Sequence, residues 1–455
     1  VYCITSVADA PARASMQNVV QFNGYHGCAW CLHPGVFIQG SIKYPVSVAV
    51  DDRSEATMLA DMESAAANNR TINGVKGPSP LINVPGFDIV WSFGPDYMHC
   101  VLLGVVRQVT DLWLSDVGEE HYIGAPSTVA KVDRRLLSQK PHLSCNRPPR
   151  SLKLRKYWKA SGWESWLLYY CLPCLEDILP KQFLEHVALL VSAVYLLLKS
   201  HVTMEDIDEG RRKITKFVVL MEYHYGEAQM TSNVHTLTHL PKSVLLHGPL
   251  WALSCFEFEA SMGNLLKLVS SSNGVAFQIL SRLLLKNNFN QMRSMASEEV
   301  RDLCFQNTPD RHAEIKLLGK PQPPSQQLTD FVRGRLTAVN QVHEYHRVCV
   351  SGSTVHSMQY KPATKRDSTA VRIGSAYAKV EHIVNVSRDD GSSEIFVISH
   401  EYQVNDLGDV AHLKVACKTP VRNLYPLSPA VRPCMYLHID DTVIFAELCN
   451  RFGSF

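Results

Sequence analysis

The sequence has no long apolar run, no overall excess of one charge and no disulfide-type cysteine pattern. Its longest apolar segment covers only residues 187–198, whereas a helix that spans a bilayer needs about 20 residues, so we predict no membrane partner. The 45 Lys and Arg nearly balance the 43 Asp and Glu, and this balance indicates no partner by itself. The 13 cysteines are odd in number and widely spread, which favours a reducing compartment over a secreted disulfide scaffold.

What the sequence does contain is a globular composition and one concentrated basic window. Hydrophobic residues make up 46% of the 455 positions and charged residues 19%, so we expect two or three folded domains rather than disorder. Residues 131–159 hold ten Lys or Arg against the single acid Asp133, and aromatic residues follow at the end of this window. Basic and aromatic side chains together suit contacts with phosphates and bases, although an ordinary solvated surface gives the same pattern. The predicted DNA contacts are Arg134, Arg135, Lys140, Arg147, Arg150, Lys153, Arg155 and Lys156.

The residue pattern predicts helices in the first two thirds of the chain and strands in the last quarter. A short strand is expected at residues 1–7, and a Pro- and Gln-rich linker at 320–327 precedes a short helix. Residues 348–455 contain short β-branched runs separated by Gly, Asp-Gly and Pro, which indicates a small barrel-like β domain. Helices are predicted at 12–22, 55–69, 97–114, 166–179 with a break at Pro173, 183–199, 205–225 and 274–285.

Two acidic residues lie where a strand or loop meets a predicted helix. Asp9 follows the strand 1–7, a common position for a metal-binding acid in α/β folds, but an aspartate there also suits a helix N-cap, and one residue can serve both roles. Asp96 lies with His99 at the first turn of the helix 97–114. On local grounds this pair reads as an N-cap with a histidine at the edge of the core.

Cys28 and Cys31 lie on a turn rich in Gly and Pro. Two thiolates at this spacing can face one cation, as in zinc knuckles, although a redox pair or chance gives the same spacing. A tetrahedral zinc site needs two more ligands. The nearest local candidates, His26 and His33, are unusually spaced for a complete site.

His235 and His239 are the better-spaced partners for the two cysteines. They are one helical turn apart, so both can face one ion if this stretch is helical. The four residues would then form a Cys2His2 zinc site that joins distant segments, with ordinary core or surface histidines as the alternative. The stretch HTLTH differs from the HExxH pattern of zinc proteases because Thr236 occupies the position of the general-base glutamate, which disfavours a zinc hydrolase.

Several of these motifs occur in one order along residues 1–287. The stretches are VADAPARA, GYHGCAWCLHPG, FGPDYMHCVLLGV, NVHTLTHL and GPLWALSCFEFEASMGNLLKLV. In this order they resemble the catalytic region of CACTA-type (TNP2-like, EnSpm) DNA transposases, which are cut-and-paste enzymes with an RNase H-like fold and a DDE triad. The order of Asp, CxxC, paired His and Glu is also similar to the V(D)J recombinase catalytic subunit and its Transib relatives, in which CxxC and two His bind structural zinc.

The resemblance implies roles for individual residues. Asp9 matches the second catalytic acid, and Glu259 matches the third because the acid of the family precedes small residues and Gly-Asn. Glu257 is two positions away and cannot face the same metals if both lie on one helix. Together with a first acid, Asp9 and Glu259 would hold catalytic Mg²⁺ or Mn²⁺. Structural Zn²⁺ would be held by Cys28, Cys31, His235 and His239. Asp96 and His99 match the D-x2-H motif of the family, with a structural or supporting role.

The fold class expected from pattern and resemblance is α+β. An incomplete RNase H-like catalytic core carries a large, mostly α-helical insertion, and a small β-rich, barrel-like domain follows. We place the truncated core at 1–300 with a zinc-pinned insertion at about 36–250, the linker and helix at 301–347, and the β-rich domain at 348–455. Because no residue matches the first acid and the chain begins at Val1, we expect a fragment that is inactive as it stands.

The resemblance implies DNA strand cleavage and strand transfer at transposon ends. By this resemblance, the partners of the protein would be transposon-end DNA and target DNA in the nucleus. The resemblance is also compatible with a homo-oligomer. The alternative is a domesticated, inactive remnant that serves as a DNA- or protein-binding module. A third reading is a zinc-stabilised structural protein without a nucleic-acid role, which failure to bind any DNA at low salt would favour.

Overall fold

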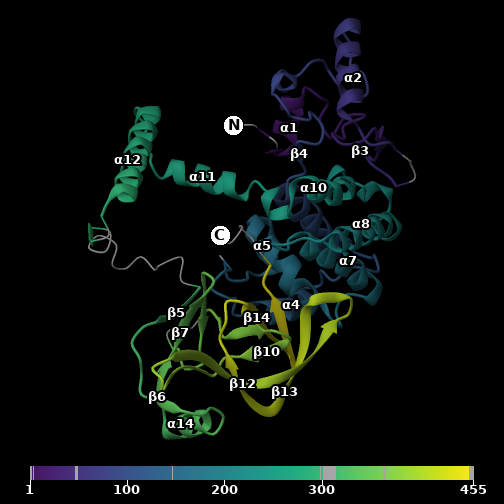
Figure 1. The fold of residues 1–455 in the computed structure, drawn as a ribbon. Coiled ribbons are helices and arrows are strands. Elements are labelled where there is room, and N and C mark those ends of the chain that lie inside the picture. Colours follow the sequence, from purple (N-terminus) through teal and green to yellow (C-terminus); the bar gives the residue numbers. More distant parts are fainter. Residues whose placement is uncertain are drawn as a thin grey trace. The chain divides into compact units, whose positions relative to one another are not determined.

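A computed structural model describes residues 3, 5–46, 50–145, 147–297, 299–300, 314–361 and 365–449. The chain divides into two units (Figure 1). One is formed by Val1–Ser254 with Glu314–Phe455, and the other by Cys255–Ala313. Each unit is described by itself below. The fold class is α+β, as predicted, with 43% of the structure helical and 23% in strands. The predicted domain borders stay predictions.

The first part of the larger unit is a small mixed module that surrounds the cysteine turn. β1 (Ser6–Val7) pairs in parallel with β4 (Phe93–Gly94), and β2 (Val36–Ile38) forms a hairpin with β3 (Ser41–Lys43). Helix α1 (Ala10–Gln17) begins after Asp9 and carries Pro11 in its first turn, which suits a residue without an N–H. Helix α2 (Glu55–Asn68) begins with a capping box of Ser54 and Thr57.

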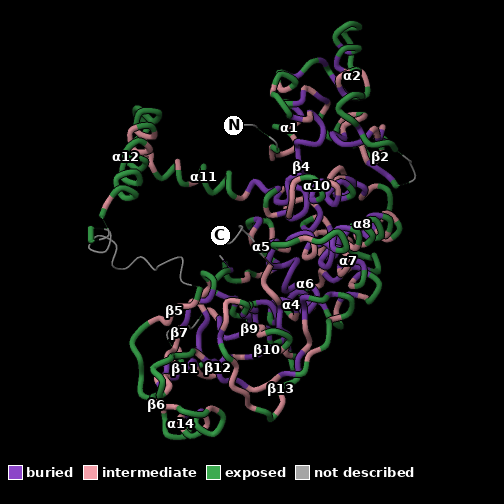
Figure 2. The backbone as a smooth tube through the Cα atoms, viewed as in Figure 1, coloured by how far each residue is buried: buried purple, intermediate pink, exposed green. Residues whose placement is uncertain are grey.

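A helical region follows and continues the larger unit. The segment Met98–Val106 is π-helical and runs directly into α3. Most residues from α5 to α7 are buried, as the purple trace in Figure 2 shows. The helices are α3 (Arg107–Ser115), α4 (Pro126–Leu137), α5 (Ala160–Ser165), α6 (Cys171–Leu175), α7 (Lys181–Leu197), α8 (Met204–Tyr225), α9 (Ser232–Thr236) and α10 (Leu240–His247). Short 3-10 turns are formed by Pro80–Asn83, Leu152–Tyr157, Glu227–Gln229, Leu237–His239 and Leu250–Ala252.

The predicted helix break at Pro173 is wrong. Pro173 lies inside α6, which follows a π-helical turn, Trp166–Tyr170. A proline lacks the N–H of an α-helical hydrogen bond and crowds the carbonyl four residues earlier. A wider π-turn just before it relaxes both constraints, so the helix continues to Leu175. The helix predicted at 183–199 is confirmed as α7, and the apolar run 187–198 supplies most of the buried residues of this helix.

The predicted C-terminal barrel is confirmed. Six antiparallel strands follow one another in the order β10-β9-β14-β15-β13-β12, and a further pairing of β10 with β12 closes the ring. β11 and β6 extend the sheet beyond β12, and β5, β7 and β8 form a separate three-stranded sheet. Helix α14 (Gln326–Arg333) packs its apolar face on β6, β11 and β12. The strands are β5 (Ile315–Leu318), β6 (Val339–Tyr345), β7 (Arg347–Val350), β8 (Ser353–His356), β9 (Ala370–Ile373), β10 (Ala376–Lys379), β11 (His382–Arg388), β12 (Ser393–Leu407), β13 (Val410–Pro426), β14 (Arg432–Ile439) and β15 (Thr442–Glu447).

Buried polar contacts join the barrel to the helical region. The Nε2 atom of His412 on β13 lies 2.9 Å from the Leu168 carbonyl oxygen, and the His412 ring stacks on Tyr195 of α7 with ring centroids 3.9 Å apart. Arg135 of α4 donates to the Asp440 carboxylate, with its Nη2 2.6 Å from Oδ2. Because these groups are paired across the contact, the barrel and the helices form one continuous unit.

The smaller unit contains two helices among its described residues. These are α11 (Phe256–Leu266) and α12 (Val275–Met295), neither of which buries a side chain (Figure 2). Gln278 near the start of α12 bonds to the backbone and hydroxyl groups of Ser270 and Ser271, which fixes the connection between the helices.

The RNase H-like core stays a prediction. Of the strand predicted at residues 1–7, positions 1, 2 and 4 lie outside the described residues, and Ser6–Val7 form β1, whose partner strand among the described residues is β4. Among the described helices, none combines the length and the apolar character that crossing a membrane requires.

Candidate metal centre

Two cysteines and two histidines from distant parts of the larger unit meet in its interior. The Cys31 Sγ lies 3.2 Å from the His235 Nε2, and the Cys28 Sγ lies 3.4 Å from the His239 Nε2. The two Nε2 atoms are 3.3 Å apart. All four ligand atoms lie within 4.8 Å of one another, and none of the side chains is more than 8% exposed. This Cys/His cluster can therefore hold a metal ion.

The distances within the Cys/His cluster fit one particular coordination geometry. In a tetrahedral zinc site, with bonds of about 2.0–2.1 Å to nitrogen and 2.3 Å to sulfur, two nitrogens lie about 3.3 Å apart and a nitrogen and a sulfur about 3.5 Å apart. The observed separations of 3.3, 3.4 and 3.2 Å are close to these values. The donor atoms are thus already arranged around a point where one ion fits.

Arg53 fixes the backbone of the cysteine turn. Its Nε donates to the carbonyl oxygens of both Cys28 and Cys31, at 3.1 Å each, and one Nη donates to the Asn73 carbonyl at 2.6 Å. The side chain is only 3% exposed. Burial lowers the pKa of Arg53, and the neighbouring Cys28 and Asp61 oppose that shift. Nothing in the sequence around Arg53 indicated this role, because the residue lies in a polar stretch 22 and 25 positions beyond the cysteines.

Two glycines allow the cysteine turn to pack closely. A Cβ atom on Gly27 would lie 2.4 Å from the Gln21 carbonyl oxygen and 2.8 Å from the Tyr44 hydroxyl. Gly74 adopts φ +82°, and a Cβ atom there would lie 2.4 Å from the His26 carbonyl oxygen. Any larger side chain at either position would push the turn away from its neighbours.

The histidines are presented by a short helical stretch. His235 lies on α9, whose N-cap Thr231 accepts a hydrogen bond from the Val234 N–H. His239 ends the following 3-10 turn, Leu237–His239. This stretch is helical, as the pairing of the two histidines required, and their four-residue spacing places both rings on one side.

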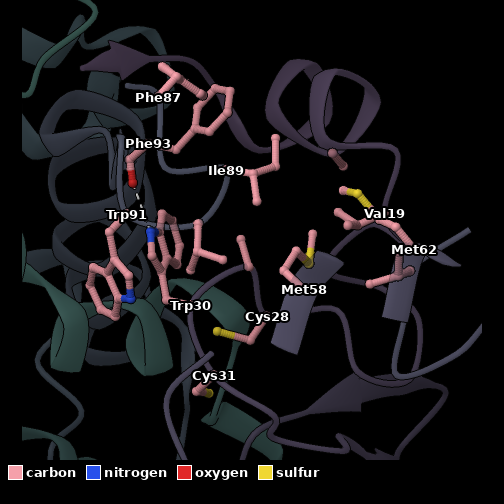
Figure 3. Close-up of a cluster of buried hydrophobic side chains, with 14 of the residues drawn as sticks. Val19, Cys28, Trp30, Cys31, Met58, Met62, Phe87, Ile89, Trp91 and Phe93 are labelled. Atoms are coloured by element: carbon pink, nitrogen blue, oxygen red, sulfur yellow. Dashed lines mark hydrogen bonds between the residues drawn. The ribbon is translucent and has the colours of Figure 1, made fainter. Parts of the chain in front are cut away.

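Aromatic side chains enclose the cluster. Tyr44 stacks on His235 with ring centroids 5.1 Å apart, and Trp30 lies 5.7 Å from the His239 ring. The Trp30 Nε1 donates to the Phe93 carbonyl oxygen at 2.8 Å, and Cys28 lies at the edge of the same apolar core (Figure 3). These rings limit the access of water to the donor atoms, and a lower local dielectric strengthens their interaction with a cation.

The two local histidines do not complete the site. His33 uses both of its ring nitrogens elsewhere: Nδ1 accepts from the Gly35 N–H at 3.0 Å, and Nε2 lies 3.1 Å from the Pro45 carbonyl oxygen. Its ring packs edge-on against His235 instead. His26 is not part of the Cys/His cluster. The partners that the sequence placed more than 200 residues away are the ones that meet the cysteines.

The two thiols of the Cys/His cluster have pKa values shifted in opposite directions. Burial by itself raises the pKa of Cys28, but a hydrogen bond from Cys31 and the nearby His239 and His235 lower that pKa well below its usual value. The same hydrogen bond, together with burial, raises the pKa of Cys31. The thiolate is the form of cysteine that binds a metal, and the lowered pKa of Cys28 favours that form.

Asp9, Asp96 and His99 line one hollow beside the Cys/His cluster. This hollow has about 480 Å³ of empty space, part of it open to solvent, and Cys28 and His235 also border it. Asp9 is the N-cap of α1, since its Oδ1 accepts from the Ala12 N–H at 2.8 Å. The structure thus brings the predicted acid and the D-x2-H pair to the same place.

Asp96 and His99 are tied to each other and to the start of a helix. Asp96 accepts from the Met98 and His99 backbone N–H groups at 3.2 and 3.0 Å, and its Oδ2 contacts the His99 Nδ1. The carboxylate is buried, with the residue 3% exposed. This is the N-cap arrangement predicted on local grounds, and it turns the His99 ring toward the hollow's rim.

Glu259 belongs to the smaller unit. It lies in the first turn of α11, two positions after Glu257, and is exposed within that unit. The two glutamates are on one helix, so their side chains point in different directions, as expected. The catalytic role of Glu259 stays a prediction.

The predicted DNA contacts fall into two groups. Arg135 and Arg155 are engaged inside the protein: Arg135 is buried and pairs with Asp177 and Asp440, and the Arg155 Nε lies 2.5 Å from the Asp111 Oδ1. Arg135 is thus withdrawn from solvent, whereas the Arg155 side chain stays 26% exposed in an ion pair near the surface. The exposed members are Arg134, Lys140, Arg147, Arg150, Lys153 and Lys156.

Comparisons of the chain with protein-family models, with curated proteins and with solved structures found no match.

Proposed function

We propose that the Cys/His cluster is a structural zinc centre. The observation that carries this proposal is the meeting of Cys28, Cys31, His235 and His239 in the interior, with N–N and N–S separations close to those of a tetrahedral zinc site. Thiolates and imidazoles are the ligands that zinc prefers, and four protein ligands leave no position for a substrate, which is typical of a structural site. The ion would join the N-terminal module to the helical region.

We further propose that the chain derives from a DDE-type DNA transposase of the CACTA kind. The proposal rests on the ordered motifs of the sequence. It is supported by two features that the resemblance implied together: the Cys/His cluster, and the gathering of Asp9, Asp96 and His99 around the hollow beside it. In the proposed reaction, Mg²⁺ or Mn²⁺ at Asp9 and Glu259 would drive strand cleavage and strand transfer on DNA. Exposed basic residues of the window would contact the phosphates.

A cleavage assay on DNA with transposon-like ends tests the catalytic part, with the protein in its complete reading frame and Mg²⁺ or Mn²⁺ supplied. Asp9→Asn is the informative variant, because asparagine keeps the helix N-cap while it removes the carboxylate. Glu259→Gln is the second, with Glu257→Gln as its matched control on the same helix. We expect the first two to abolish cleavage and the control to retain it.

The alternative function is a transposase-derived module that binds DNA without cutting it. The exposed basic residues of the window support this reading independently of the acids. DNA binding that persists in a protein with no cleavage under any divalent metal would favour the module. Cleavage that survives both Asp9→Asn and Glu259→Gln would contradict the proposed catalytic residues.

A further inference from the structure

A second and larger hollow, which the zinc centre and the acids do not use, lies where the helical region meets the barrel. It has about 2230 Å³ of empty space, part of it open to solvent, and the centre of a water molecule can reach about 880 Å³ of it. Ligand sites usually have volumes of about 300–1,000 Å³, so this hollow has room for a ligand of several chemical groups. Its walls come from the end of α7, from the turn between β7 and β8, and from strands of the barrel. We call it the junction cleft.

The described residues that line the junction cleft include one carboxylate, and this carboxylate is neutralised. The Arg372 Nη1 donates to both carboxylate oxygens of Glu447, at 2.8 and 3.0 Å, and the Tyr377 hydroxyl donates to the same group. The Glu447 side chain is only 14% exposed. Because its charge is paired and mostly buried, Glu447 does little to repel an anion from the cleft.

Positive side chains line the junction cleft on both its helical and its barrel side. Lys199, just after α7, donates to the Asp206 carboxylate at 2.6 Å, and Asp206 is not part of the lining. Lys414 of β13 likewise donates to Asp406, which also lies outside the lining. Arg432 of β14 lines the cleft and is exposed, and no ion pair engages it within the described part of the chain. The lining therefore presents an excess of positive charge, of which Arg432 is the most available member.

The junction cleft adjoins the basic window. Ser144 belongs to the window and lines the cleft. The neighbouring Leu143 is fixed to the barrel, because its N–H donates to the Ser368 hydroxyl at 3.1 Å. The exposed Arg147 follows three positions after Ser144. A strand whose phosphates contact the window can therefore continue into the cleft.

The lining of the junction cleft suits phosphate groups better than bases. Tyr377 is only 4% exposed, and one ring face of Tyr195 is covered by His412, so the cleft does not offer the open aromatic platform that base stacking needs. Serine hydroxyls, lysines and arginines are the groups that commonly bind phosphate oxygens. Serines from three separate segments line the cleft, namely Ser144, Ser192, Ser200, Ser351 and Ser353.

We propose that the junction cleft binds the phosphate groups of an anion, either of a single-stranded nucleic acid that continues from the basic window or of a small free polyphosphate. Arg432 meets the phosphates, with Lys199 and Lys414 on the opposite sides of the cleft. The inference deepens the proposed function, because the strand as a source rests on the basic window being a DNA contact. It gives the C-terminal barrel a part in holding the ligand.

Ala411 offers a way to fill the junction cleft from an exposed position. It lines the cleft on β13, and an aromatic side chain suits a strand. Ala411→Trp should therefore occupy the space without replacing a buried residue. Val421→Trp is the matched control, because Val421 is exposed on the same strand and is not part of the lining.

Arg432→Gln tests the charge and leaves the shape of the junction cleft nearly unchanged. The loss of one phosphate contact should make the slope of log affinity against log salt shallower by about 0.7 for a single strand. Lys418→Gln is the control for charge, since Lys418 is exposed on β13 outside the lining.

The experiment titrates the full chain with a twelve-nucleotide oligo-dT, followed by fluorescence anisotropy, and with tripolyphosphate, followed by calorimetry, both at low salt. We expect Ala411→Trp to weaken binding by about tenfold or more, and Val421→Trp and Lys418→Gln to bind both probes as the wild type does. A loss confined to oligo-dT identifies the strand as the source of the phosphates. A loss shared by tripolyphosphate shows that the free anion is sufficient.

Cys449 reports on occupancy independently of affinity. It lines the junction cleft, whereas Cys417 on β13 is exposed outside the lining. Alkylation by iodoacetamide, followed at each cysteine by peptide mass spectrometry, should slow at Cys449 when a probe is bound and stay unchanged at Cys417. Equal rates at Cys449 with and without saturating probe would overturn the proposal.

The cleft is also ruled out if Ala411→Trp and Arg432→Gln bind both probes as tightly as the wild type, or if the wild type binds neither. A titration with duplex DNA separates this result from failure of the proposed DNA contact. Duplex binding without oligo-dT or tripolyphosphate binding removes the cleft and leaves the DNA contact of the basic window. Tripolyphosphate binding that Ala411→Trp abolishes, without duplex binding, retains the cleft and removes that DNA contact.

Discussion

The Cys31 Sγ lies 3.2 Å from the His235 Nε2, although 204 positions separate the two residues in the chain. The partner pair, Cys28 and His239, is 211 positions apart and equally close. Two contacts between the same two distant segments therefore meet at one point. This coincidence is what makes the Cys/His cluster a defined candidate for a metal centre instead of a chance group of buried polar residues.

The first prediction concerns metal content. Elemental analysis should find one zinc per chain in the purified protein and none in the double variant Cys28→Ser/His239→Ala. Because metal binding free energy is folding free energy when the ligands come from separate segments, the variant should also unfold several kcal/mol more easily in urea. Correctly folded wild-type protein without zinc would contradict the proposal.

The second prediction concerns Arg53. Arg53→Lys keeps the charge but cannot donate from one Nε to the carbonyl oxygens of both Cys28 and Cys31. Groups that orient metal ligands typically contribute 10- to 100-fold to affinity, so zinc affinity measured against a competing chelator should fall by about that factor. Arg70→Lys is the control, since Arg70 is exposed near the end of α2. Equal affinity in both variants would show that Arg53 does not position the ligands.

The third prediction separates steric clash from backbone strain at two glycines. Gly74 and Gly86 have similar φ angles of +82° and +73°, but only Gly74 would place its Cβ atom 2.4 Å from a carbonyl oxygen. Gly86→Ala should lower the free energy of unfolding by about 1–2 kcal/mol, the strain of a left-handed alanine. Gly74→Ala should lower it further and reduce zinc content. Denaturant titration with parallel metal analysis measures both, and equal effects would argue against the close contact with His26.

The fourth prediction concerns acid sensitivity. Burial lowers the pKa of His186 to about 4, while its Nε2 contacts the Phe217 carbonyl oxygen at 2.9 Å. The neighbouring His224, also with a lowered pKa, is the titratable ring that faces it. Below an unfolded pKa of about 6.5 the unfolded chain takes up a proton that folded His186 refuses until about pH 4. This contribution to stability is thus complete above pH 6.5 and is lost as the pH falls toward 4.

The matching measurement uses urea unfolding at pH 6.5 and pH 5.0. For His186 the loss over this interval should be about 1.6 kcal/mol, because the unfolded histidine is half protonated at pH 6.5 and the slope approaches about 1.4 kcal/mol per pH unit only below that pH. His186→Gln should lose that much less, because glutamine does not titrate. Comparing wild type and variant cancels the acid sensitivity of the Cys/His cluster, which both proteins share. An identical pH dependence would mean that the pKa of His186 is the same in the folded and the unfolded chain.

The fifth prediction concerns DNA affinity. The triple variant Arg134→Gln/Lys153→Gln/Lys156→Gln removes three exposed cations of the window. If each contacts a phosphate, the slope of log affinity against log salt should become shallower by about 0.9 for each lost contact. Lys181→Gln is the control, because Lys181 is exposed on α7 outside the window. A slope that the triple variant leaves unchanged would exclude this surface as the DNA contact.

The sequence predicted the structure best where the residues that determine an element lie within a few positions of one another. Helix α2 was expected at 55–69 and forms at Glu55–Asn68, because its N-cap Ser54 and its apolar spacing act within a few residues. The histidine pair could be recognised because two residues four positions apart lie on the same face of a helix. The strand-rich barrel was likewise visible in its β-branched runs and turn residues.

Features that depend on packing between distant residues could not be predicted in this way. Arg53 and Tyr44 support the Cys/His cluster through contacts that carry no spacing signal. Arg135 and Arg155 look like members of a basic surface in the sequence, yet their partners Asp440 and Asp111 remove them from it. Pro173 was misjudged because the π-turn before it depends on packing around Trp166, not on the proline itself.

The separation of the ligands in the chain also orders events during synthesis. At about 5–20 residues per second, the ribosome needs about 10 to 40 s after Cys31 to reach His235, 204 positions later. Until then the two thiols of the N-terminal module have no histidine partners and cannot be closed off from solvent by them. The cysteine turn therefore reaches its final packing only after the segment that carries His235 and His239 has been made.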